Sequence, residues 1–163
     1  MNLIDGNVIS AVIRGELKGE LSEFGERPSI AGTLLGKDPV SATYVRNKER
    51  ACEMVGMRSE VLRLPKNTGE EETMSKIEEI NDESNFNGIF VQLPLPPQIN
   101  EKKIIRRIDT IKDVDGFHPI NLSLLIAGEP RFVPRTPLGI RFPPPEVASR
   151  LRKSTQLSLE RQR

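Results

Sequence analysis

Three short candidate strands, separated by segments with helical periodicity, constrain the fold of this chain more than any other feature. They lie at 28–36, 59–64 and 88–92, and the first is an apolar run bounded by Pro28 and Gly36. Such runs between turn-forming residues are typical of buried strands. Because strands that alternate with helices pair through crossover connections, the pattern predicts an α/β fold with a mostly parallel sheet.

Helical segments fill the intervals between these runs. The predicted helices cover 5–24, 41–55, 68–80, 100–108 and a short segment after Asn121. The first carries an apolar stripe at helical spacing. Ser41 and Asn100 are the predicted N-caps of the second and fourth helices, and Gly56 is the predicted stop of the second.

Composition and charge exclude several classes of protein. Hydrophobic residues make up 36% of the chain and charged residues 29%, which is typical of globular proteins. The formal net charge of +1 provides no field that would attract nucleic acid or a membrane surface. No apolar run approaches the roughly 20 residues of a membrane helix, and the first residues do not resemble a signal peptide. With Cys52 as the single cysteine, we expect a cytoplasmic protein whose partners are neither nucleic acid nor membrane.

The composition changes after Ile140. Residues 141–163 are basic, contain a run of prolines and lack glycine. These features predict two parts, a folded domain at 1–140 and a poorly ordered basic tail at 141–163.

Candidate chemistry begins on the second predicted helix, with the segment Tyr44-Val-Arg-Asn-Lys48. A spacing of four puts the phenol and the ammonium on one helix face, with Cβ atoms about 5–6 Å apart. A partly desolvated lysine beside a phenol can act as a base. A surface lysine one turn from a half-buried tyrosine explains the same spacing.

A second candidate is Val91-Gln-Leu-Pro-Leu-Pro-Pro97, in which prolines stop the predicted strand directly after Gln92. The Gln92 amide would offer a donor and an acceptor at the carboxyl end of the strand, where ligands of open α/β sheets collect. A strand terminator followed by a solvated glutamine is the simpler alternative.

The third candidate, Ile111-Lys-Asp-Val-Asp-Gly-Phe-His-Pro119, is too rich in turn residues to be a helix. Asp113 or Asp115 could accept hydrogen bonds from the N–H groups of a heterocycle. His118 is expected to be a loop or packing residue. No second histidine or carboxylate cluster at metal spacing accompanies it, so we expect no metal site.

Taken together, the three segments are specific. The order Tyr44-x-x-x-Lys48, Gln92-Leu-Pro-Leu-Pro96 and Lys112-Asp-Val-Asp-Gly116 resembles the methylenetetrahydrofolate dehydrogenase/methenyltetrahydrofolate cyclohydrolase family. The segments 132–134 and 136–139 resemble the region in which that family leaves its catalytic domain, so the resemblance covers about residues 2–140. It implies a three-layer sandwich around the parallel sheet.

The resemblance also implies roles for individual residues. Lys48 would be the central catalytic group, Tyr44 would stack against the folate, and Gln92 would bond to the lysine. Catalytic roles therefore fall on Lys48, Tyr44 and Gln92, and substrate binding on Tyr44, Gln92, Leu93, Pro94 and Asp115. Asp115 would anchor the pterin, and the Leu93–Pro94 peptide bond is expected to be cis.

Family members oxidise methylenetetrahydrofolate with NADP, hydrolyse the resulting methenyl compound, and form homodimers. They carry a Rossmann domain after the catalytic domain, whereas this chain has no glycine after Ile140; Arg135 and Ser123 also stand where cysteine and glycine are usual. We therefore expect a truncated member without the Rossmann cofactor domain or an identifiable NADP site. Such a chain would retain only the cyclohydrolase activity, and its dimerisation is doubtful.

Two other hypotheses remain. One is a non-catalytic module that binds folate or depends on a partner carrying the cofactor domain. The other is a short-chain dehydrogenase, which also places Tyr-x-x-x-Lys on a helix, but no glycine-rich turn follows the first predicted strand here, as that class requires.

Overall fold

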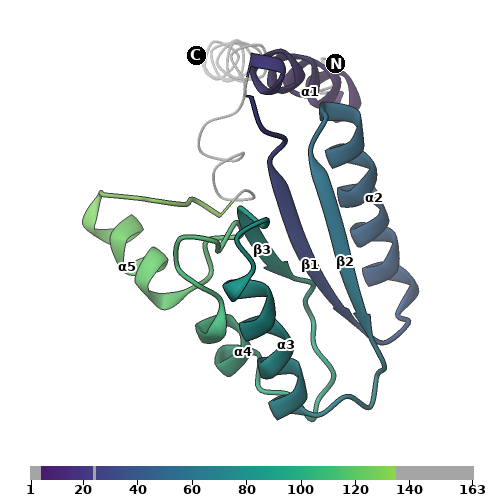
Figure 1. Ribbon diagram of the computed structural model, residues 1–163, viewed down its shortest axis with the longest axis vertical. Helices are drawn as coiled ribbons and strands as arrows, with labels where there is room; N and C mark the ends of the chain where they lie inside the picture. The colour runs from purple at the N-terminus through teal and green to yellow at the C-terminus, as the bar shows by residue number, and fades with distance from the viewer. Residues whose placement is uncertain (1–4, 24, 135–163) are drawn as a thin grey trace, which may run out of the picture.

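Three parallel strands form the centre of the protein (Figure 1). The computed structural model describes residues 5–23 and 25–134. The strands are β1 (Ser29–Leu35), β2 (Arg58–Leu64) and β3 (Gly88–Val91), in the order β2-β1-β3. The predicted α/β fold with a parallel sheet is confirmed. The predicted tail at 141–163, together with Arg135 and the segment 136–139, lies outside the described residues.

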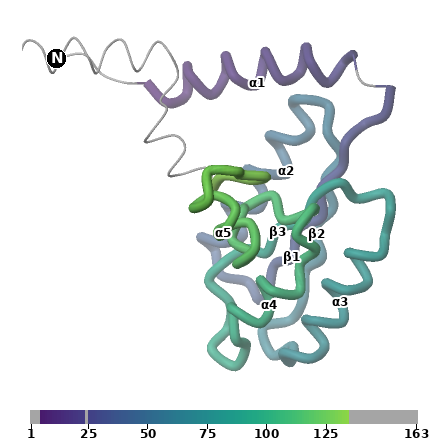
Figure 2. Tube along the Cα trace, turned by 90° about the vertical axis from the view of Figure 1, so that its left-hand side faces the viewer, coloured from purple at the N-terminus to yellow at the C-terminus, as the bar shows by residue number. Residues whose placement is uncertain are grey.

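Helices cover both faces of this sheet (Figures 1 and 2). The helix α2 (Pro39–Val55) lies on one face, and α3 (Glu70–Asp82) and α4 (Glu101–Arg107) lie on the other. Alternate residues of β1 supply the two cores: Ala31 and Leu35 pack with α3 and α4, and Leu34 packs with α2. The layers therefore follow the predicted three-layer sandwich.

The helix boundaries correct three local predictions. Asp38, not Ser41, caps α2: its carboxylate accepts a 2.7 Å hydrogen bond from the Ser41 amide, and this bond lowers the pKa of Asp38. The proline at the first helical position suits the earlier start. The helix α3 begins at Glu70 rather than at 68 because Gly69 is its N-cap. The helix α5 (Pro119–Ala127) begins before Asn121.

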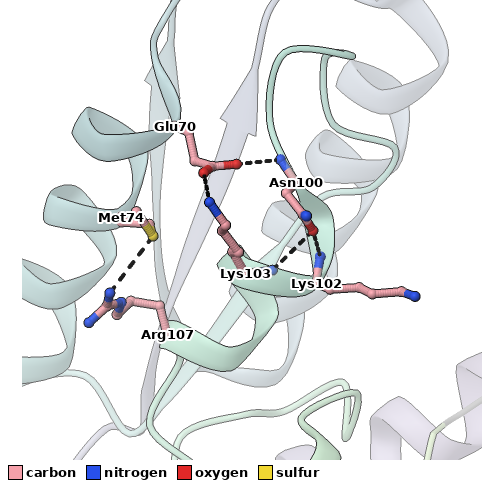
Figure 3. A network of polar contacts seen from close by, with 6 residues as sticks. All are labelled: Glu70, Met74, Asn100, Lys102, Lys103 and Arg107. Atoms are coloured by element: carbon pink, nitrogen blue, oxygen red, sulfur yellow. Dashed lines mark hydrogen bonds and ion pairs between the residues drawn. The ribbon is translucent and has the colours of Figure 1, made fainter.

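Two other predicted helix ends are confirmed. The helix α2 ends at Gly56, which adopts a left-handed conformation with a φ of 90°. Asn100 caps α4, because its side chain accepts hydrogen bonds from the Lys102 and Lys103 amides (Figure 3).

The helix α1 (Gly6–Glu23) forms as predicted but buries none of its residues among those described. Val8, Val12 and Ile13 of the apolar stripe are exposed to solvent. The helix lies beyond the end of the sheet, across the end of α2 (Figures 1 and 2). Across residues 5–23 and 25–134, none of the helices combines the length and apolar character that a membrane span requires.

Polar contacts join α3 to the start of α4 (Figure 3). The Glu70 carboxylate accepts a 2.7 Å hydrogen bond from the Asn100 amide and forms a 2.6 Å ion pair with Lys103. The hydrogen bond from Lys103 is the main cause of the lowered pKa of Glu70, and the same bond raises the pKa of Lys103. These contacts are at the surface, where ion pairs add little stability.

Candidate functional site

The predicted site residues come from three elements that meet near the carboxyl ends of the strands. Tyr44 and Lys48 lie on α2, which follows β1, and Gln92 follows β3 directly. Asp115 belongs to the loop 111–119. That loop runs beside β3, because the Ile89 amide donates to the Lys112 carbonyl at 2.6 Å and the Val114 amide donates to the Ile89 carbonyl at 3.3 Å.

Lys48 and Asp115 come together at this edge. The Lys48 Nζ lies 4.0 Å from the Asp115 Oδ1, and the two side chains are 39% and 28% exposed. The same Nζ lies 4.0 Å from the centre of the Phe90 ring. Lys48 therefore sits between a carboxylate and an aromatic ring while remaining open to solvent.

Gln92 extends the pairing of β3 with β1 by one residue, since its amide donates to the Thr33 carbonyl at 2.9 Å. Strand alternation places its side chain on the same face as Phe90, the face that α2 covers. The side-chain Nε2 donates to the Leu93 carbonyl at 2.7 Å. The predicted bond between Gln92 and Lys48 stays a prediction. The Leu93–Pro94 peptide bond is cis, as predicted.

Tyr44 is 60% exposed and lies one helical turn before Lys48. Its neighbour Val45 is fully buried against the sheet. The phenol is therefore on the outer side of α2, where a bound molecule could reach both Tyr44 and Lys48.

The two aspartates of the loop have different surroundings. Asp113 is 1% exposed, and its carboxylate accepts hydrogen bonds from the Gly116 amide, the His118 amide and the Asn121 Nδ2 at 2.8–3.1 Å. Asp113 therefore organises the loop from within, and Asp115 is the aspartate that faces Lys48.

Lys112 and His118, the other polar side chains of the loop, make structural contacts. The Lys112 Nζ donates to the carbonyls of Asn81 and Glu83, at 2.7 and 2.8 Å, and so satisfies the C-terminal end of α3. The His118 Nδ1 accepts a 3.1 Å hydrogen bond from the Ile120 amide and caps α5. His118 is buried as well, in agreement with a packing role.

Sequence reasoning missed Phe90 and Asn121. Phe90 precedes Gln92 by two residues, so strand alternation could have placed its ring on the same face. Asn121 was read only as the start of a helix, although it lies one turn after His118 and its amide reaches the Asp113 carboxylate. Its bonding partner could not be inferred from spacing alone.

A cavity of about 510 Å³ lies beside the site and is lined by Asp38, Ser41, Lys66 and Pro94, among others. Its volume falls in the range of about 300–1,000 Å³ that is usual for ligand pockets. Of the predicted site residues, only Pro94 lines it. No group of three histidine, cysteine, aspartate or glutamate side chains within residues 5–23 and 25–134 could hold a metal ion.

Comparison with protein families identifies the family of this chain. The family model described as tetrahydrofolate dehydrogenase/cyclohydrolase, catalytic domain, matches residues 4–115. The chain belongs to this family. The match contains Tyr44, Lys48, Gln92 and Asp115, of which Lys48 and Asp115 are in contact.

Individual relatives agree with the family match. The bifunctional protein FolD of Halalkalibacterium halodurans is 46% identical over 141 residues, covering 85% of this chain and 50% of the relative. The crystal structure of the FolD enzyme from Campylobacter jejuni has a TM-score of 0.81 and 42% identity, covering 86% of this chain and 51% of that one. The Trypanosoma brucei enzyme, complexed with NADP cofactor and inhibitor, has a TM-score of 0.82 and 33% identity, covering 86% and 50%. This chain thus spans about half the length of the relatives it matches.

Proposed function

We propose that this chain binds tetrahydrofolate derivatives at the carboxyl edge of the sheet and hydrolyses methenyltetrahydrofolate to formyltetrahydrofolate. The observation that carries the proposal is the placement of the Lys48 Nζ 4.0 Å from the Asp115 carboxylate. Family membership supplies the substrate class. The loop in which Asp113 fixes the backbone around Asp115 supports the assignment of Asp115 as the anchor.

The proposed reaction assigns a different task to each side chain. Asp115 accepts hydrogen bonds from the N–H groups of the pterin, and Tyr44, which is exposed, stacks on the ligand. Water adds to the methenyl carbon and gives up one proton, which is returned to the nitrogen that leaves. The bond between the methenyl carbon and that nitrogen breaks with its electron pair going to nitrogen, and the second proton of the water is released to solvent as the formyl C=O forms. Lys48 is the group that receives and returns the proton. Gln92, Leu93 and Pro94, at the carboxyl end of β3, contact the bound folate in this proposal.

The oxidation of methylenetetrahydrofolate, the other reaction of the family, would require NADP, which the Trypanosoma brucei structure contains. The helix N-termini that follow β1 and β2 do not fit its pyrophosphate. The Asp38 carboxylate already caps α2, and α3 begins with Glu70, Glu71 and Glu72, which would repel phosphate. We propose that the described residues supply the folate side of the site and no dinucleotide site.

Assembly and location stay predictions. The resemblance implies a homodimer for the family, and dimerisation of this chain is the doubtful part of that expectation. Sedimentation velocity of the purified chain would test it. A cytoplasmic location agrees with Cys52, which is a free, buried thiol.

Hydrolysis of methenyltetrahydrofolate by the purified chain, followed by the loss of its absorbance, tests the proposal. We expect Lys48→Met to lower the rate by about 10²-fold or more, with folate binding retained. The matched control is Lys76→Met: Lys76 lies on the opposite layer and pairs with Glu79, so its loss should leave the rate unchanged. Folate binding without turnover by the parent chain would favour a non-catalytic folate-binding module. An unchanged rate in Lys48→Met would remove Lys48 from the mechanism.

A further inference from the structure

The Phe90 ring occupies space that is free because the neighbouring Gly32 has no side chain. Gly32 of β1 pairs with Phe90 of β3 in the parallel register. A Cβ atom at position 32 would lie 2.3 Å from the Phe90 Cζ and 2.7 Å from Cε1, which is closer than side chains can approach. Any residue other than glycine at position 32 would therefore displace the ring.

The packing around the ring holds it on the α2 face. Phe90 is 2% exposed and forms a small core with Leu34 and Val45. An aromatic side chain enclosed in this way has few alternative rotamers, since protein interiors are packed as densely as crystals. The ring is therefore a rigid feature of the sheet.

Lys48 lies directly above this ring, with its Nζ 4.0 Å from the ring centre. This separation is well inside the limit of about 6 Å for a cation–π interaction. The Asp115 oxygen, also 4.0 Å away, is at the outer limit for an ion pair. A lysine has a long, flexible stem, and a half-exposed ion pair of this length would leave its ammonium loosely placed.

We propose that Phe90 is a positioning residue. Its ring packs against Gly32 and holds the Lys48 ammonium near the Asp115 carboxylate. This inference rests on the function proposed above, in which Lys48 moves a proton at the bound folate. The alternative is that Phe90 only fills the core between β3 and α2. The two roles predict different effects on kcat when the ring is replaced by one of similar size but altered charge distribution.

The contact itself can be measured without any turnover. An aromatic ring shifts the NMR signals of protons held over its face to higher field. We expect the Lys48 ε-CH₂ protons of this chain to show such a shift, and Phe90→Leu to abolish it. Phe86 is the matched control, because it is also buried but belongs to the core on the other face of the sheet; Phe86→Leu should leave the Lys48 signals in place. Ordinary Lys48 shifts in the parent chain would overturn the proposal.

Kinetics with fluorinated rings tests the positioning role. Mono-, di- and trifluorophenylalanine, incorporated at position 90 alone, weaken the negative face of the ring stepwise while nearly preserving its size. We expect kcat for methenyltetrahydrofolate hydrolysis to fall with each added fluorine, by about 3- to 10-fold across the series. The KM for the folate and the melting temperature should stay nearly constant.

The outcomes separate the two proposals. An active parent chain whose kcat is insensitive to fluorination, or falls only in step with the melting temperature, leaves Phe90 as a core residue and overturns the positioning role. Absence of turnover by the parent chain contradicts the proposed function instead, and the NMR measurement still decides whether the ring holds Lys48.

Discussion

The two faces of the sheet are built for different tasks. The face under α3 and α4 carries the larger core, in which Ile77, Ile89 and Ile104 are fully buried. The α2 face has a smaller core around Leu34, Val45 and Phe90, and it ends at the half-exposed Lys48. The larger apolar core therefore holds the sheet from one side, and the other side is free to carry a charged group at its edge.

The largest expected effect on stability is on the α3 face. Ile77 is 0% exposed, so Ile77→Ala removes buried methyl groups and leaves a cavity. We expect the free energy of unfolding to fall by about 2–5 kcal/mol, measured by urea denaturation. Folate affinity, measured under conditions in which the variant is folded, should be unchanged. A loss of affinity without a loss of stability would contradict the division between the faces.

A smaller effect is expected where the loop of the site joins the α3 layer. Lys112→Met keeps most of the stem but removes the two hydrogen bonds to the end of α3. We expect a loss of about 1 kcal/mol in the free energy of unfolding and a modest loss of folate affinity, because the loop also carries Asp115. Full stability in this variant would show that the α3 end is solvated without Lys112.

The smallest effect concerns the ion pair between Glu70 and Lys103, and it depends on pH. The pKa of Glu70 is lowered from its ordinary value of 4.5, so its contribution to stability is present above that value and is lost as the pH falls through the lowered pKa. The pKa of Lys103 is raised from its ordinary 10.5, so its contribution is lost as the pH rises through the raised pKa.

We therefore expect Glu70→Gln to melt slightly below the parent chain between these limits and together with it in strong acid. Thermal melts of both proteins across this pH range would measure the difference. A gap that persists in strong acid would show that the carboxylate stabilises the chain in some way other than its charge.

The sequence was sufficient for the layers of the fold, whereas the membership of the site stays a prediction beyond the contact between Lys48 and Asp115. Apolar runs and helical periodicity show which residues are buried, so the strands of a parallel sheet could be predicted from them. The end of α2 could be predicted because glycine at position 56 is a common helix stop. The start of α2 was misplaced because Asp38 and Ser41 are both good caps, although the preference of proline for the first helical position favours Asp38.

The parts that could not be predicted depend on contacts between distant segments. The distinct roles of Asp113 and Asp115 follow from the bridge that places their loop against β3. The position of the Phe90 ring follows from the strand register that pairs Phe90 with Gly32. Neither register nor loop position is fixed by the spacing of residues along the chain.

The central claim, that Lys48 and Asp115 act on one bound folate, is tested most directly by a double-mutant cycle in kcat/KM for methenyltetrahydrofolate hydrolysis. The cycle compares the parent chain with Lys48→Met, Asp115→Asn and the double variant. Because the Lys48 ammonium and the Asp115 carboxylate are in contact, and residues in contact show non-additive effects, we predict that the loss in the double variant is smaller than the product of the two single losses. Losses that multiply in full would mean that the two side chains act independently and would contradict this account.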